Sequence, residues 1–345
     1  MSSLNLAVTG IGMVTGVGLN APASCAAIRA AVDNFQETRF MDAEGEWLKG
    51  SEVPFSEPWR GRSRLLKLAA SAIRECLDGD EAIISTATPL LLCMPELQRP
   101  GRLVVDDGAF FRELEQELQL SFHPQSGVVA SGHVSVAVGL QRARQLFDEF
   151  HLDHVVIAAT DSLLVAPTLS HFEQKERLLT STNSDGFIAG EASAALVVEP
   201  FRRRPSGQLL CRGLGFAVEH ATVDSEEPLR GDGLTEAIKQ ALHDANCSES
   251  VLQFKIIDAS GGQYAFKESS IAFSRIDRTK REEFDVWHPA DCVGEVGAAI
   301  GAVMVAVLKC ACEKGYAKGT EVLLHLANDD GRRSAMIFSW NTPDR

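Results

Sequence analysis

The chain has 345 residues, of which 45% are hydrophobic, and a formal net charge of −14 at pH 7. This length and composition can bury one large core or two similar ones. The acidic balance argues against nucleic acid as a main partner, because neutralising phosphates needs clustered Lys and Arg. The 8 cysteines lie scattered without a C-x-x-C pair, which indicates reduced thiols and a cytoplasmic protein.

The N-terminal segment is apolar but does not have the pattern of a membrane or export signal. Residues 1–20 contain several glycines and no early Lys or Arg, so they predict a strand followed by a glycine turn rather than a signal peptide. No apolar run elsewhere exceeds strand length without Gly, Pro or charge. We therefore expect no membrane insertion.

Strands and helices are predicted to alternate through the first half of the chain. A strand over residues 4–9 leads into a glycine turn at 10–18, and the Trp and Pro residues of segment 34–63 indicate a packed loop. Hydrophobic periodicity predicts the other elements of this half. They are helices over 21–31, 64–77 and 108–118, a strand over 89–94, a strand-to-helix elbow at Ser131, a helix ending at Phe150, and a buried strand over 155–159.

The second half is predicted to begin after Arg204 and to alternate in the same way. Its expected elements are a strand over 211–219, a helix over 233–245, a strand over 255–259, a small-residue helix over 296–313, and a hairpin of 321–327 with 335–340. Alternation in both halves predicts an α/β fold with mostly buried sheets. We expect two halves, residues 1–204 and 205–345.

Glycine-containing motifs occur at four places along the chain, in a fixed order. They are V-T-G-I-G-M-V-T at 8–15, the elbow at 127–139, D-G-F-I-A-G-E-A at 185–192 and G-E-V-G-A-A-I-G at 294–301. In this order and spacing the chain resembles the β-ketoacyl synthases of the thiolase superfamily. The resemblance implies a thiolase-like α/β fold of two similar βαβαβ halves in stacked layers, and a dimer formed through the strand near Val128.

The resemblance also implies a catalytic cysteine and two histidines, and this chain replaces all three. Ser131 stands at the cysteine position, or Gly132 if the register shifts by one, and no cysteine occurs between Cys93 and Cys211. The histidine positions hold Ser260 and Glu295, and the late F-G-F-G-G turn is N-D-D-G-R-R at 328–333. We therefore expect no catalytic residues, only degenerate positions at Ser131, Ser260 and Glu295.

Three groupings carry chemical alternatives. A serine at an elbow can be a nucleophile, but it needs an adjacent base. The aligned neighbours of Ser131 are Ser260 and Glu295, and His133 is predicted to point elsewhere on the helix. A helix cap is therefore favoured for Ser131.

Cys292 with His288 could form a thiol–imidazole pair only if residues 289–293 were helical. Pro289 and Gly294 predict a loop, so a structural thiol is favoured. His151, Asp153 and His154 have metal-like spacing, but a solvated helix end is the plainer interpretation. We expect no metal and no cofactor.

Three functional hypotheses remain. The first is a non-catalytic protein that acts through protein–protein interaction, as an accessory or co-chaperone for a secreted type VI effector; that role rests on analogy. The second is a subunit that modulates an active ketosynthase, as chain length factors do. The third is an atypical β-ketoacyl synthase or acyltransferase that uses Ser131. A homodimer or a heteromer with another protein is expected in each case.

Overall fold

The computed structural model describes residues 4–78, 83, 85–280 and 282–342. Its strands form a 12-stranded sheet whose two halves repeat one order. The first half runs β1 (Leu6–Thr15), β7 (Ala189–Pro200), β6 (Val155–Ser162), β4 (Leu90–Met94), β5 (Gly127–Ala130). The second runs β8 (Gln208–Val218), β12 (Arg332–Asn341), β11 (Glu321–Ala327), β9 (Phe254–Ile257), β10 (Asp285–Trp287).

Strand directions also repeat between the halves. In each half the first two pairings in this order are antiparallel and the last two are parallel. Residues 6–8 of β1 pair with β8 and join the halves. The junction falls between Pro200 and Gln208, and we propose residues 1–204 and 205–345 as the two halves.

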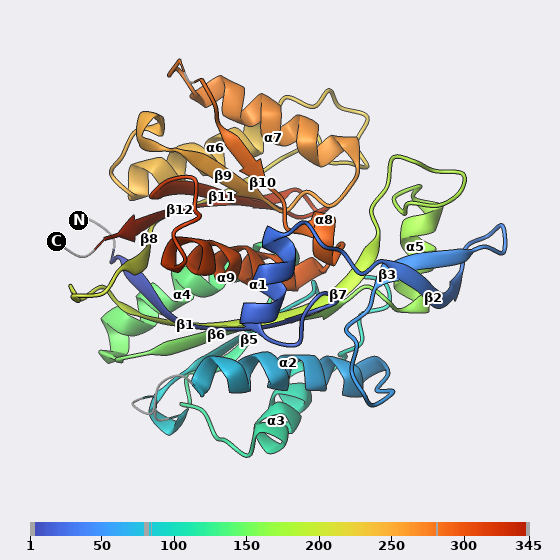
Figure 1. The fold of residues 1–345 in the computed structure, drawn as a ribbon, viewed down its shortest axis with the longest axis horizontal. Helices are drawn as coiled ribbons and strands as arrows, with labels where there is room; N and C mark the ends of the chain where they lie inside the picture. Colours follow the sequence, from blue (N-terminus) through green and yellow to red (C-terminus); the bar gives the residue numbers. More distant parts are fainter. Residues whose placement is uncertain (1–3, 79–82, 84, 281, 343–345) are drawn as a thin grey trace.

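Helices cover both outer faces and fill the space between the halves of the sheet (Figure 1). The outer layers are α6 (Asp232–Asp244) with α7 (Gln263–Ile276) on one side, and α2 (Gly61–Leu77) with α3 (Asp107–Leu118) on the other. The middle layer contains α1 (Ala21–Arg29), α4 (Ser135–Phe150) and α9 (Ile300–Glu313). This confirms the predicted α/β fold of stacked layers.

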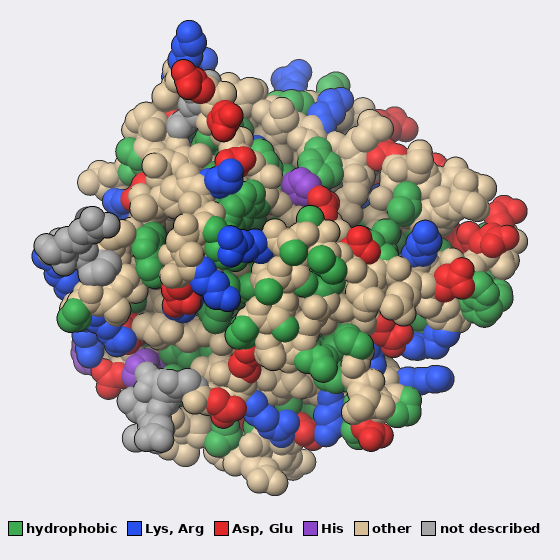
Figure 2. Space-filling model, viewed as in Figure 1, with side chains coloured by type: hydrophobic (Ala, Val, Ile, Leu, Met, Phe, Trp, Pro, Cys, Tyr) green, Lys and Arg blue, Asp and Glu red, His purple; other side chains and the backbone are tan. Residues whose placement is uncertain are grey.

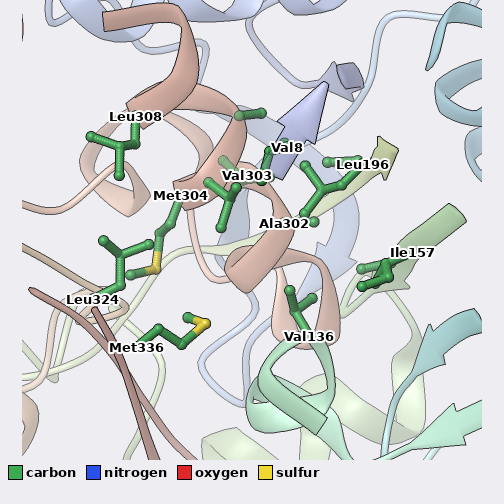
Figure 3. Close-up of a cluster of buried hydrophobic side chains, with 14 of the residues drawn as sticks. Val8, Val136, Ile157, Leu196, Ala302, Val303, Met304, Leu308, Leu324 and Met336 are labelled. Atoms are coloured by element: carbon green, nitrogen blue, oxygen red, sulfur yellow. The ribbon is translucent and has the colours of Figure 1, made fainter. Parts of the chain in front are cut away.

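The central helix α9 is buried on every side. All residues from Ile300 to Cys312 are buried, and Figure 3 shows that its side chains lie among those of both halves. Val303 and Met304 share one cluster with Val136 and with strand residues of β7, β11 and β12. A Cβ at Gly301 would lie 3.0 Å from Val136, so the small residues of α9 allow it to pack closely against α4.

Two predicted elements were wrong. Segment 34–63 is not a loop, because it forms the hairpin of β2 (Gln36–Met41) and β3 (Trp47–Ser51) and the start of α2. Phe40 and Leu48 point inward and alternate with outward residues, as side chains do along a strand with one covered face. The glycine turn at 10–18 is also wrong, because β1 continues to Thr15 with a bulge between Val8 and Gly10.

Glycines lie inside β1 because α2 crosses it closely. A Cβ on Gly12 would lie 2.0 Å from the carbonyl oxygen of Ala72 and 2.7 Å from the backbone nitrogen of Cys76.

Gly12→Ala should therefore lower the free energy of unfolding by about 2 kcal/mol, because the backbones of β1 and α2 must separate. Urea denaturation checks this. Gly127→Ala is the control, since nothing lies within 4 Å of its Cβ position, and equal losses in the two variants would contradict the expectation.

The other expected elements are confirmed with shifts of a few residues at their ends. Among the described residues, none of the helices has both the length and the apolar character needed to cross a bilayer.

Candidate functional site

The predicted elbow lies at the end of β5. Gly132 has φ +61°, a left-handed conformation that favours glycine. Residues 132–134 form a 3₁₀ turn (η2), and α4 follows at Ser135. The side chain of Ser131 makes no capping hydrogen bond, so the predicted capping role is wrong. Its carbonyl instead accepts a hydrogen bond of 2.9 Å from the Asn328 side chain.

A carboxylate fills the space beside this elbow. A Cβ built on Gly132 would lie 1.9 Å from Oε1 of Glu96, a residue of the segment that follows β4. A side chain at position 132 would therefore need Glu96 to move. Cys93 lies near α4, donating to the Ser135 carbonyl at 3.3 Å. It is fully buried, and burial raises the pKa of its thiol to about 12, so this thiol stays protonated.

The second half repeats the elbow at Gly297. This residue has φ +52° and opens a 3₁₀ turn, Gly297–Ala299 (η4), before α9. The Asp161 carboxylate at the end of β6 lies against it, since a Cβ there would be 2.1 Å from Oδ2. Asp161 accepts from the Ala298 backbone at 2.9 Å and from both terminal nitrogens of Arg99 at 2.5 and 2.6 Å. Each elbow thus has a carboxylate beside its glycine.

His133 joins the two elbows. Its Nδ1 lies 3.1 Å from Oδ2 of Asp258, just after β9, and its Nε2 lies 3.0 Å from Oε1 of Glu295. Ser260 Oγ donates to the other oxygen of Glu295 at 2.5 Å, and the Gly297 backbone donates to Oε1 at 2.8 Å. We call His133, Asp258, Ser260 and Glu295 the inter-half network.

This arrangement corrects one prediction about the site. We expected His133 to point elsewhere on the helix, and that was wrong. Residues 132–134 form a 3₁₀ turn rather than the first turn of α4, so the imidazole faces the second half. The structure brings Ser260 and Glu295 together, as the motif alignment implies.

Charges in the network favour an imidazolium between two carboxylates. Burial opposes the charge on His133, but Glu295 and Asp258 raise its pKa well above the usual value. Burial opposes the charge on Glu295 too, yet His133, Ser260 and the Gly297 backbone lower its pKa to about 2. Both imidazole nitrogens are therefore donors, with no lone pair to accept a proton. Glu295 is too weak a base to activate the Ser260 hydroxyl.

Two adjoining pockets open over the network. One is a polar pocket of about 250 Å³ and the other, partly apolar, is about 440 Å³; His133 and Glu295 line both. Arg177 and Asp329 also line both pockets and form an ion pair at 3.2 Å. His171 lines the larger pocket. None of the described residues that line either pocket is a cysteine.

The remaining predicted groupings form no part of this network. Residues Ala290–Val293 form a short helix (α8), so the loop predicted there was wrong. Cys292 is buried, and burial raises the pKa of its thiol to about 11. His154 lies 3.6 Å from Glu199. Over the part of the chain that the structure describes, no three or more His, Cys, Asp or Glu side chains gather as metal ligands.

The contribution of the Glu96 carboxylate to the cost of a side chain at position 132 can be measured. Gly132→Ala should cost about 1–2 kcal/mol of unfolding free energy, partly from the left-handed backbone and partly from the Glu96 contact. In a Glu96→Ala background the cost should fall, because only the backbone term remains. Thermal and urea unfolding of the four proteins give both costs. Identical costs in the two backgrounds would show that Glu96 does not fill the space beside Gly132.

Comparison with known proteins identifies the fold of the chain. No protein-family profile matches the chain. A Schizosaccharomyces pombe protein has the name "Putative 3-oxoacyl-[acyl-carrier-protein] synthase, mitochondrial". It is 24% identical to this chain over 215 residues, which are 55% of this chain and 50% of that protein. The chain thus spans about half the length of this curated relative.

Solved structures match over nearly the whole chain. A type II polyketide synthase complex of acyl-carrier protein with its ketosynthase has a TM-score of 0.80 at 14% identity, covering 98% of this chain and 99% of that one. The Xenorhabdus doucetiae ketosynthase in complex with its chain length factor matches at 0.75, with 15% identity and 98% of both chains covered. A β-ketoacyl synthase from Burkholderia phymatum matches at 0.75 and 15%, covering 97% and 99%. The chain therefore has the ketosynthase fold, as its motifs indicated.

Proposed function

We propose that this chain is a ketosynthase-fold protein that performs no condensation and acts as a binding subunit of a protein complex. The inter-half network carries the proposal. At the place where condensation would need a thiolate and free imidazole donors, His133 is held by Asp258 and Glu295, and a carboxylate fills the space at Gly132.

The charges around the pockets are unsuited to the chemistry of a condensing enzyme. Stabilising an enolate oxyanion requires hydrogen-bond donors aimed at the developing negative charge. Glu96, Glu295 and Asp258 are acceptors when ionised, and Glu295 and Asp258 already occupy both nitrogens of His133. A new negative charge beside them would be repelled. Loss of condensation is the expected consequence.

Binding to another ketosynthase-fold chain is the form of this proposal that the comparisons support best. One similar structure is a ketosynthase in complex with its chain length factor. The match covers 98% of this chain and 98% of the matched chain of that complex. A subunit that binds and modulates an active ketosynthase therefore suits this chain in fold. We propose β5 as the contact strand, since it is the last strand at its end of the sheet and its residues are half-buried.

Affinity purification of the tagged chain from its native cells tests the proposal. An active ketosynthase among stoichiometric partners supports the modulating role. A secreted effector or its adaptor would support the narrower accessory role in type VI secretion.

Val128→Lys on β5 should abolish the complex while thermal unfolding shows an intact fold. Val251→Lys, at a 41% exposed site, should leave the complex intact. A chain that purifies without a stoichiometric partner would contradict the proposal.

A further inference from the structure

We infer that the tip of the β2–β3 hairpin is a docking surface for a partner segment that combines basic and apolar side chains. The inference rests on the proposed function, since it names the chemistry of the partner. Met41 and Trp47 are paired across the hairpin immediately before its turn. They are 51% and 47% exposed, so the pair forms an uncovered apolar surface next to the turn.

The hairpin tip lies at one end of the molecule. Figure 1 shows it projecting beyond the body beside α5 (Ala166–Gln174). Figure 2 shows acidic side chains and exposed hydrophobic side chains together at the same end. The inner face of the hairpin is already covered, because Phe40 and Leu48 pack in a cluster with Phe172 and Leu169. The outer face, with Met41 and Trp47, is left open to a partner.

The turn between the strands is held in one shape. Oδ1 of Asp42 accepts hydrogen bonds from the backbone of Glu44 at 3.1 Å and of Glu46 at 2.8 Å. The Ala43 backbone donates to Glu173 of α5 at 2.5 Å and ties the turn to the body. A surface ordered before binding loses little conformational entropy on association.

Charge determines which partner fits this tip. Asp42, Glu44 and Glu46 are in the turn, and a hollow of about 320 Å³ beside it is lined by Asp42, Glu44, Glu173 and Glu176. None of the described residues that line this hollow is Lys or Arg. Lys or Arg side chains of a partner would complement these carboxylates, whereas an acidic partner would be repelled.

Met41 and Trp47 supply the apolar part of the recognition. Trp is the residue most enriched among binding hot spots, and its ring face also accepts Lys or Arg cations. Met adapts its shape to different apolar side chains. The basic residues of the hairpin, Arg39 and Lys49, lie farther from the turn, and Arg39 is 3.6 Å from Glu52. The partner segment therefore crosses the tip rather than running along the strands.

Fluorescence polarisation with a labelled synthetic peptide of alternating Lys and Leu tests the surface. Trp47→Ser should weaken binding by about tenfold, and Trp59→Ser, at a 36% exposed site on another segment, should change it less than about twofold. Glu44→Lys with Glu46→Lys should weaken binding far more than Glu282→Lys with Glu283→Lys, which changes the net charge equally. A Glu–Leu peptide should not bind. Equal effects in the matched pairs would overturn the inference.

The purified complex separates this inference from the proposed function. If the hairpin variants retain the partner while Val128→Lys releases it, the inference about the hairpin is wrong and the binding role stands. If the wild-type chain holds no partner, the proposed function itself fails. Loss of the partner in the hairpin variants, with unchanged thermal unfolding, supports both.

Discussion

Replacing His133 with Ala should lower the free energy of unfolding at pH 7 by about 3–5 kcal/mol, the usual cost of removing one partner from a buried ion pair. Asp258 and Glu295 would then face each other without a counter-charge, and both are less than one tenth exposed. No other described cation is within ion-pair distance of either carboxylate. The two halves of the fold would lose the side chain that links their elbows.

The pH dependence identifies the cause of this loss. Glu295 has a folded pKa of about 2, below its unfolded value of 4.5, so its contribution is present above pH 4.5 and is lost as the pH falls towards 2. His133 has a raised pKa, so its contribution is full below its unfolded value of 6.5 and is lost as the pH rises through the folded pKa. The network should therefore stabilise the protein most between pH 4.5 and 6.5.

Urea denaturation at pH 4, 5.5 and 7 measures the effect. The loss in His133→Ala should be smaller at pH 4 than at pH 7, because protonation of the freed Glu295 carboxylate removes its charge beside Asp258. His220→Ala is the control, since His220 is exposed. If the two histidine variants lost equal stability, or if the loss in His133→Ala did not depend on pH, the charged network would be refuted.

Arg333→Ala should destabilise the fold by a similar amount, about 3–5 kcal/mol. Arg333 on β12 is 2% exposed and donates to Glu268 on α7 at 2.8 Å, to the Asn328 carbonyl at 2.6 Å and to the Tyr264 hydroxyl at 3.0 Å. Burial already raises the pKa of Glu268, while Arg333 lowers it. Without Arg333 this carboxyl should be protonated, and the Asn328 carbonyl would keep only the Gly331 backbone as a donor.

Two comparisons isolate the buried pair at Arg333. Arg332→Ala removes a neighbouring but 40% exposed arginine that pairs with Asp330, so its cost should stay below about 1 kcal/mol. The double variant Arg333→Met with Glu268→Leu should be more stable than Arg333→Ala, because it removes the buried carboxyl that would otherwise have lost its partner. A loss in Arg333→Ala no larger than that in Arg332→Ala would contradict this assignment, as would a double variant less stable than the single one.

Sequence patterns predicted the parts of the fold that depend on periodicity and small residues. Helix α9 and the β11–β12 hairpin are where the patterns indicated them. Gly12 was placed in a turn because its role, a close approach of β1 to α2, depends on a residue far along the chain, Ala72. The β2–β3 hairpin is not predicted because its alternation is short and is followed closely by Pro54 and Pro58.

The site was predicted less completely than the fold. Ser260 and Glu295 follow recognisable motifs, so their proximity could be inferred from the resemblance. His133 and Glu96 could not be identified in the same way. A 3₁₀ turn, set by the left-handed Gly132, turns His133 towards the second half, and Glu96 lies in an irregular segment after β4. A glycine followed by histidine at the end of a buried strand was the available signal.

The two elbows share a backbone geometry, and their side chains bind one another. The elbow glycines Gly132 and Gly297 both have left-handed conformations, so the two halves repeat the same turn. Side chains at the site instead satisfy one another, with Glu295 accepting from His133, Ser260 and Gly297. A network closed in this way joins the two elbows and stabilises the contact between the halves.

The most direct test is a condensation assay of the purified chain with malonyl and acyl thioesters, followed by intact-mass analysis of the protein. We predict no condensed product or carbon dioxide above the rate without protein, and no acyl adduct on the chain. Enzyme-dependent turnover, or an adduct that disappears in Ser131→Ala or Ser260→Ala, would contradict the account.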